Sequence, residues 1–296
     1  MKTEAAKKGL LRRVRRQRLN YIAVLPSLIT ILNGVCGFVA IILASKSPAQ
    51  RLGGHSYLAL AGYMVLVAMV WDMLDGRLAR MSQSTSSFGG QLDSLCDIVS
   101  FGVAPAFLML KMLESELRTA GLADGDFLER FIWLAAAAYL SCAAIRLARF
   151  NVENEEDESA HMSFVGLPAP AAAGVLVSLV IFHQQTLPRL SGTGLYAFCE
   201  SLILCVLPVV ALCVAVLMVS RIRYPHVLNQ YIKGRKPFAH LIRMLLLLAF
   251  AWWELPAALM VAFCGFAASS AVKRLYYRVL KKNALLPVVQ TFGAER

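Results

Sequence analysis

No two of the seven cysteines in this chain have the Cys-x-x-Cys spacing of a zinc or dithiol site, and no His-Glu-x-x-His motif is present. The cysteines lie within apolar stretches, and the five histidines are scattered along the chain. Small buried thiols are therefore a better interpretation than disulfides or zinc ligands. We also expect no metal-binding role for the histidines.

Charged side chains are scarce: Asp, Glu, Lys and Arg make up 16% of the residues, whereas 58% are hydrophobic. The mean hydropathy is +0.61, which is too apolar for an ordinary soluble domain and indicates a polytopic membrane protein. No base-reading motif accompanies the net charge of +12. Basic residues at the ends of apolar runs explain that charge better than a nucleic-acid partner, which we do not expect.

Apolar runs predict an all-α integral membrane protein, a helical bundle of about eight transmembrane helices. Residues 239–272 are expected to hold the seventh and eighth spans. Each of the two would be short of the roughly 20 residues that a span needs, so one long span or a re-entrant element is the alternative. The expected domains are a basic tail (1–20), a transmembrane domain (21–272) and a second basic tail (273–296). The other six spans are expected at residues 21–45, 57–74, 88–110, 131–150, 168–183 and 194–219.

Basic residues are distributed unevenly between the two ends of these spans. If the N-terminus is cytoplasmic, 24 of the 30 Lys and Arg residues also lie on that side, which fits the positive-inside rule and predicts two cytoplasmic termini. The basic N-terminal segment has no small-residue cleavage site, so we expect a tail rather than a signal peptide. The acidic stretch 153–158 is expected to be a solvated loop, with a metal or substrate role as the alternative. The six outer basic residues are Lys46, Arg51, Lys111, Arg118, Arg130 and Arg189.

Four aspartates stand in the stretch WDMLDGRLARMSQSTSSFGGQLDSLCDIVSF (71–101), which membrane-like sequence flanks on both sides. Asp72 and Asp75 are three residues apart and share one face of the second span, while Asp93 and Asp97 are four apart and share one face of the third. A short loop joins the two helices, so the four carboxylates are expected to converge at the cytoplasmic face. Unpaired charges there are costly. Oxygen ligands suit Mg²⁺, Mn²⁺ or Ca²⁺, and four carboxylates suffice for two ions.

The residues between the aspartates suit an anionic substrate. Gly76, Gly89 and Gly90 allow the backbone to approach a ligand closely. Arg80 offers a planar fork for phosphate, and serines such as Ser86 offer hydroxyl donors. An ordinary cytoplasmic turn explains the loop by itself, but it does not explain four ionisable groups inside membrane helices.

The spacing Asp72-x2-Asp75-Gly76-x2-Ala79-Arg80-x8-Gly89-x3-Asp93-x3-Asp97 resembles the complete signature of the CDP-alcohol phosphotransferases. The resemblance implies a membrane enzyme that displaces CMP from a CDP-linked lipid, using an alcohol acceptor and divalent metal, Mg²⁺ or Mn²⁺, with two ions. By the family's pattern Asp72, Asp75 and Asp93 are metal ligands. Asp97 is the family's general base and a ligand of the second ion. Gly76 and Ala79 would line the cytidine pocket, and Arg80 would neutralise CMP.

Further segments resemble one branch of this family, the phosphatidylserine synthases of the CDP-diacylglycerol type. The resemblance implies transfer of a phosphatidyl group from CDP-diacylglycerol to L-serine. Arg146 and Arg149 are candidates for binding the serine carboxylate, with snorkelling as the alternative. Asn33 is a candidate for contacting the nucleotide, with an interhelical hydrogen bond as the alternative. Ser27 stands where Asn is expected. The segments are LPSLITILNGVCGF (25–38), SSFGGQLDSLCDIVSFGVAPA (86–106), RLARFN (146–151), FVGLPAPAAAG (164–174) and MVSRIRYP (218–225).

Other functions remain open from the sequence. A sister enzyme would use glycerol-3-phosphate, inositol phosphate or choline as its acceptor. A divalent-cation transporter would place carboxylates near mid-bilayer, and an inactive scaffold is disfavoured because Asp97 is present. The expected partners are CDP-diacylglycerol, L-serine and membrane lipids. The family includes homodimers, so a homodimer is a further expectation. The expected location is a bacterial cytoplasmic membrane, with the active site facing the cytoplasm.

Overall fold

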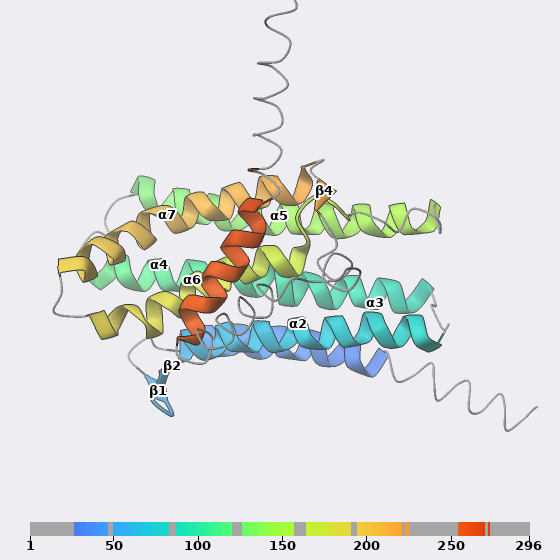
Figure 1. Ribbon diagram of the computed structural model, residues 1–296, viewed down its shortest axis with the longest axis horizontal. Coiled ribbons are helices and arrows are strands. Elements are labelled where there is room, and N and C mark those ends of the chain that lie inside the picture. Colours follow the sequence, from blue (N-terminus) through green and yellow to red (C-terminus); the bar gives the residue numbers. More distant parts are fainter. Residues whose placement is uncertain are drawn as a thin grey trace, which may run out of the picture.

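The computed structural model describes residues 27–46, 50–82, 87–119, 126–156, 164–190, 194–220, 223–224, 254–269 and 272. Within these residues six helices are long and apolar enough to cross a membrane, which confirms an all-α integral membrane protein. The long helices run along one common direction (Figure 1). The predicted tails and the stretch 225–253, which holds most of the seventh span, lie outside the described residues, so the count of eight stays a prediction.

The first membrane helix, Ser27–Ala44, is followed by two helices that meet at the aspartate stretch. The third candidate span is built from three consecutive pieces, α3, η1 and α4, in which η1 is a π-helical segment. In chain order the elements after the first helix are α2 (Tyr57–Ser82), α3 (Ser87–Asp97), η1 (Ile98–Val103), α4 (Ala104–Thr119), α5 (Asp126–Glu156), α6 (Ala169–Gln185), η2 (Leu187–Leu190) and α7 (Gly194–Val219).

Two pairs of very short strands lie between the helices in the sequence. β1 (Arg51–Leu52) pairs antiparallel with β2 (His55–Ser56) before α2. β3 (Phe164–Val165) pairs antiparallel with β4 (Arg223–Tyr224), which ties the segment before α6 to the segment after α7.

Two helices extend beyond the apolar runs that predict them. α2 continues past residue 74 to Ser82, so the whole aspartate and arginine stretch of this span is helical. α5 continues to Glu156, so the expected loop at 153–158 begins as helix, and the prediction of a loop there is wrong for its first residues. A helix satisfies its backbone groups internally, so it can leave the apolar layer without ending.

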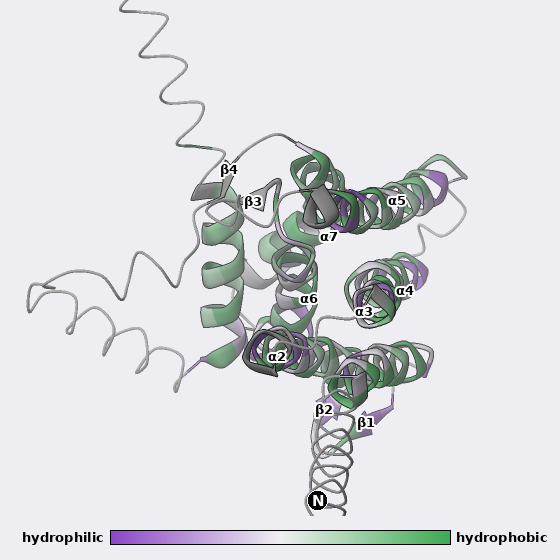
Figure 2. Ribbon diagram, turned by 90° about the vertical axis from the view of Figure 1, so that its right-hand side faces the viewer, coloured by the Kyte–Doolittle hydropathy of each residue, from purple (hydrophilic) through white to green (hydrophobic). Residues whose placement is uncertain are grey.

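A shorter apolar helix, Leu255–Ser269, lies within the stretch 239–272 whose organisation the sequence left open. It runs across the long helices instead of along them, as Figures 1 and 2 both show. Phe263 packs on Gly174 of α6 so closely that a Cβ at Gly174 would lie 2.2 Å from the Phe263 ring. Arg189 also donates a hydrogen bond of 2.8 Å to Glu254, directly before the helix.

Glycines allow the other helices to approach one another. A Cβ at Gly37 of the first helix would lie 2.4 Å from Ser100 Oγ and 2.7 Å from Ser100 Cα in η1. A Cβ at Gly62 of α2 would lie 2.6 Å from Ile181 of α6. Lipid tails are as apolar as the side chains, so close packing of small residues, more than apolar burial, holds membrane helices together.

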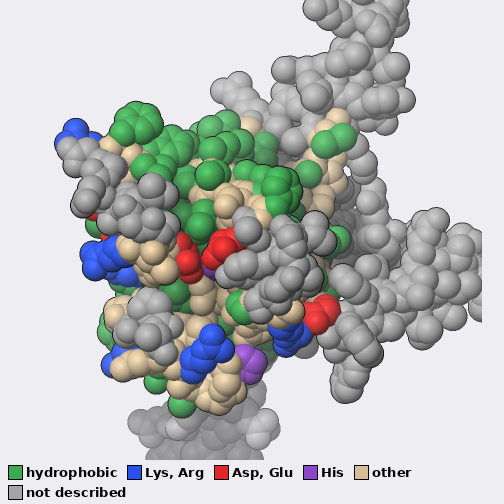
Figure 3. Space-filling view, turned by 90° about the vertical axis from the view of Figure 1, so that its left-hand side faces the viewer, with side chains coloured by type: hydrophobic (Ala, Val, Ile, Leu, Met, Phe, Trp, Pro, Cys, Tyr) green, Lys and Arg blue, Asp and Glu red, His purple; other side chains and the backbone are tan. Residues whose placement is uncertain are grey.

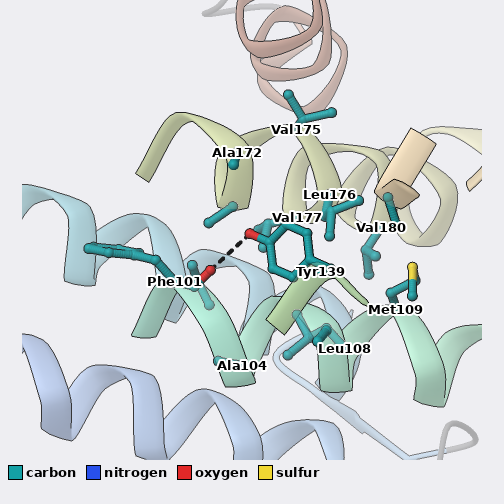
Figure 4. Packing of buried hydrophobic residues seen from close by; sticks show 14 of the residues in the cluster. Phe101, Ala104, Leu108, Met109, Tyr139, Ala172, Val175, Leu176, Val177 and Val180 are labelled. Atoms are coloured by element: carbon teal, nitrogen blue, oxygen red, sulfur yellow. Dashed lines mark hydrogen bonds between the residues drawn. The ribbon is translucent and has the colours of Figure 1, made fainter. Parts of the chain in front are cut away.

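The π-helical segment lies against the buried middle of α5 (Figure 4). Tyr139 of α5 is fully buried and donates its hydroxyl to the Phe101 carbonyl oxygen at 2.8 Å. Buried polar groups need such partners, and π-turns often occur at functional sites. Here the π-turn follows Asp97 directly.

The Gly37 contact gives a stability prediction. Gly37→Leu should lower the free energy of unfolding by about 1–3 kcal/mol, because the new side chain must displace the Ser100 backbone. Thermal unfolding of the purified protein in detergent measures this change. The matched control is Gly265→Ala in the helix Leu255–Ser269, where a Cβ meets no described atom within 4 Å. A Gly37→Leu protein as stable as the control would contradict the close packing.

Candidate functional site

The aspartate site lies where the C-terminal part of α2 meets the start of α3, at one end of the bundle. One carboxylate oxygen from each of Asp72, Asp93 and Asp97 lies within 4.8 Å of the others. Asp72 and Asp93 are half-buried, and Asp97 is 7% exposed. The structure therefore brings together three of the four carboxylates that the helical spacing predicts to converge.

Asp75, the fourth carboxylate, lies beside this group. Its negative charge acts on both Asp72 and Asp93. The Asp75 carboxylate is buried and accepts a hydrogen bond from the hydroxyl of Thr30, in the first helix. Thr30 lies in the segment 25–38 that resembles the family, and the sequence alone predicts no role for it. The structure gives it one, that of orienting Asp75.

Asn33 connects the first helix to the deepest carboxylate. Its side chain is buried, and its Nδ2 donates a hydrogen bond of 2.8 Å to Asp97 Oδ1. Its backbone oxygen accepts a hydrogen bond of 2.9 Å from Ser100 Oγ. This is the interhelical bond that the sequence left as the alternative, and a contact of Asn33 with the nucleotide stays a prediction. The two bonds fix the position of Asp97 relative to the first helix.

Among the described side chains, those of α5 bring positive charge to the site. The charge of Arg146 acts on both Asp72 and Asp97. Nearer the end of α5, Asn151 Nδ2 donates to Ser94 Oγ at 2.8 Å, which ties α5 to α3 beside the aspartates. Arg149 is half-buried on the same helix between these two residues. The structure thus places α5 next to the site, as the RLARFN segment predicts.

Open space adjoins the aspartates. A Cβ at Gly76, one residue after Asp75, or at Gly90 meets no described atom within 4 Å. Both glycines are exposed, and Gly89 is half-buried. Ala79 and Arg80 belong to the last turns of α2, but their side chains lie outside the described part of the chain, as does Ser86 as a whole. Their predicted contacts stay predictions.

The donor set fits a divalent cation. Three carboxylates lie within 4.8 Å of one another with Asp75 beside them, and among the described side chains the charge of Arg146 acts on two of the three. Buried like charges without a counter-charge are strongly unfavourable. Carboxylate oxygens are the ligands that Mg²⁺ and Mn²⁺ prefer, so the residues present suit such ions.

Sequence reasoning allowed an interhelical hydrogen bond for Asn33, but it identified neither the partner of Asn33 nor any contact of Thr30. Thr30 and Asn33 are polar residues three apart within an apolar run, which places them on one helix face. That spacing was the available signal, since polar side chains inside membrane helices usually have partners. The partners themselves are more than 40 residues away along the chain, and the sequence did not identify them.

Comparison with known proteins adds an independent finding. The sequence model of the family described as CDP-alcohol phosphatidyltransferase matches residues 23–216. Several curated relatives carry the name CDP-diacylglycerol–serine O-phosphatidyltransferase, among them the following three. The Helicobacter pylori protein is 32% identical over 208 residues, which cover 70% of this chain and 74% of the relative. The Methanocaldococcus jannaschii protein is 31% identical over 209 residues (71% and 77%), and the Bacillus subtilis protein 31% over 208 residues (70% and 92%).

Proposed function

Because the chain belongs to the CDP-alcohol phosphatidyltransferase family, we infer that it is a CDP-diacylglycerol–serine O-phosphatidyltransferase. It transfers the phosphatidyl group of CDP-diacylglycerol to the hydroxyl of L-serine and releases CMP and phosphatidylserine. The observation that carries this conclusion on the structural side is the convergence of Asp72, Asp93 and Asp97 at the α2–α3 hairpin. Carboxylates in such a group are suited to phosphoryl transfer with divalent metal.

The proposed metal ligands are Asp72, Asp75 and Asp93, with Asp97 next to them for a second ion. The proposed ions are Mg²⁺ or Mn²⁺. When bound, such ions neutralise charge on the pyrophosphate and on the leaving CMP. The protein's own part is to hold four carboxylates in place, and the bond from Thr30 to Asp75 supports that role.

The proposed proton acceptor is Asp97. In the transfer, the serine hydroxyl oxygen bonds to the lipid-side phosphorus, and the bond from that phosphorus to the bridging oxygen breaks. The hydroxyl proton passes to Asp97, and CMP leaves with the bonding electrons. The hydrogen bond from Asn33 holds Asp97 Oδ1 at 2.8 Å, which fixes the carboxylate for this step. A base fixed within reach of its proton contributes roughly 10²–10⁴-fold to the rate.

The proposed serine site is on α5. Arg146 and Arg149 would bind the serine carboxylate, since a guanidinium group matches carboxylate geometry. The interaction of Arg146 with both Asp72 and Asp97 supports its nearness to the reacting atoms. Gly76, Gly89 and Ala79 would accommodate the nucleotide, with Arg80 and Ser86 at its phosphates.

The proposed orientation places this end of the bundle in the cytoplasm, in a bacterial cytoplasmic membrane. The excess of basic residues on the same side supports it, as does the cytosolic origin of the two water-soluble reaction components, serine and CMP. A homodimer is also proposed, because the family that the sequence resembles includes homodimers.

Acceptor choice gives the direct test. Purified protein in detergent, supplied with CDP-diacylglycerol and Mn²⁺ or Mg²⁺, should release CMP when L-serine is present. Glycerol-3-phosphate, inositol phosphate and choline should leave release near the background, because a phosphorylated acceptor needs more basic groups and choline has no carboxylate for the arginines. A chelator should abolish the reaction.

The outcomes separate the alternatives. Release with another acceptor, and not with serine, would keep the family and refute the substrate. If correctly folded protein released no CMP with any acceptor, the enzyme proposal itself would fail, and divalent-cation flux into liposomes would then test the transport alternative.

A further inference from the structure

A second group of ionisable residues lies at the end of the bundle opposite the aspartates. Glu116 is near the end of α4, His183 near the end of α6 and Glu200 near the start of α7. One ligand atom from each residue lies within 4.8 Å of the others. Figure 3 views this end of the molecule and shows acidic side chains grouped near its centre. The transfer reaction uses none of these three residues.

His183 is the residue that points to a ligand. Its side chain is only 5% exposed. Its Nδ1 lies 3.3 Å from the side-chain amide of Gln184. Its Nε2 is buried and has no hydrogen-bond partner among the described residues. Buried polar atoms almost always have partners, so an unpartnered nitrogen on a buried imidazole that is grouped with two carboxylates requires an explanation.

The contact with Gln184 can fix the tautomer in which the His183 imidazole binds a metal ion. The oxygen and nitrogen of a side-chain amide are distinguished only by their surroundings. With the Gln184 amide turned over, its oxygen accepts a hydrogen bond from the Nδ1–H of His183. Nε2 then carries a lone pair. Metal-bound histidines usually donate their other ring N–H to a neighbouring acceptor, which fixes the tautomer and the ring orientation.

The charges around His183 favour a cation. The carboxylates of Glu116 and Glu200 repel one another, and the charge of Glu200 also acts on His183. Ionisable groups inside membrane helices usually have a function.

We propose that Glu116, His183 and Glu200 form a second divalent-cation site, separate from the catalytic aspartates. One imidazole and two carboxylates are a mixed nitrogen and oxygen donor set, which suits Zn²⁺ or Mn²⁺ better than Mg²⁺. The bound ion would join α4, α6 and α7 at their ends and stabilise the bundle there. This proposal departs from the expectation that the histidines have no metal role, and it does not depend on the identity of the acceptor.

Metal stoichiometry tests the proposal. The full-length protein in detergent is stripped with a chelator and dialysed against Zn²⁺ in the presence of excess Mg²⁺, which occupies the aspartates. Bound zinc is then measured by mass spectrometry. Wild type should hold one Zn²⁺ more than His183→Gln or Glu116→Gln. Zinc on the cysteines is the same in all variants, so it cancels in the comparison.

The matched control is Glu114→Gln, on the same helix as Glu116 but paired with Lys111. It should bind as much zinc as wild type, and zinc should raise the thermal unfolding midpoint of both proteins but not of Glu116→Gln. If His183→Gln does not fold, Glu200→Gln replaces it. Equal zinc binding by wild type and the folded site variants would overturn the proposal and leave the cluster as a group that shares a proton.

Discussion

Asp97→Asn should reduce serine-dependent CMP release by about 10²–10⁴-fold, while the protein still folds. The amide oxygen of an asparagine at this position can accept the same hydrogen bond from Asn33 Nδ2 that Asp97 Oδ1 accepts at 2.8 Å. The buried contact to the first helix is therefore kept. The change removes the negative charge and the ability to take up the serine proton. Initial rates of CMP release and thermal unfolding, measured on the same preparation, check both halves of this expectation.

The metal dependence of the same variant distinguishes the two roles proposed for Asp97. If Asp97 acts mainly as the base, kcat stays low at saturating Mn²⁺. If it acts mainly as a ligand, the metal concentration for half-maximal rate rises and excess metal restores activity. Glu114→Gln removes a carboxylate at the other end of the bundle and should leave the rate unchanged. Asp97→Asn protein with near wild-type rates would refute both roles.

Much of the bundle could be predicted from apolar runs, because every membrane helix must satisfy its backbone inside a thick apolar layer. The helix ends could not be predicted equally well. α2 continues through Asp75 to Ser82, and α5 continues into the acidic residues as far as Glu156. Hydropathy reports where the lipid ends, whereas a helix continues until its hydrogen bonding is interrupted.

The π-helical segment Ile98–Val103 had no sequence signal. It interrupts what reads as one continuous apolar span. A residue of another helix, Tyr139, donates a hydrogen bond to its Phe101 carbonyl oxygen. Tertiary partners of this kind decide local geometry without leaving a periodic pattern.

The candidate site was likewise predictable in part from the sequence. The aspartates could be brought together from spacing alone, because residues three or four apart share a helix face and a short connection places the two faces close together. The bonds from Thr30 and Asn33 depend on how the first helix is rotated against α2 and α3, which the sequence does not specify. The group around His183 takes one residue from each of three helices that are far apart in the sequence, so no local motif indicates it.

Gly76 gives the sharpest test of where the nucleotide binds. A Cβ at this position meets no described atom within 4 Å, although the glycine follows Asp75 directly on α2. Gly76→Ala should therefore keep or raise stability, by up to about 1 kcal/mol, because glycine is a poor helix former. Gly76→Leu should nevertheless reduce CMP release by about 10²-fold, since its side chain would occupy space proposed for the cytidine and misplace the reacting phosphorus.

The kinetic pattern decides whether that space belongs to the substrate. A side chain that competes with cytidine should raise the KM for CDP-diacylglycerol progressively from Gly76→Ala to Gly76→Leu, without lowering the unfolding midpoint. Gly265→Ala is equally open, but it lies on the crossing helix and should raise stability without changing KM. Unchanged kinetics in folded Gly76→Leu would show that the nucleotide does not occupy the space beside α2. The pocket would then have to lie on the α3 side, where Gly90→Leu would be the variant that loses activity.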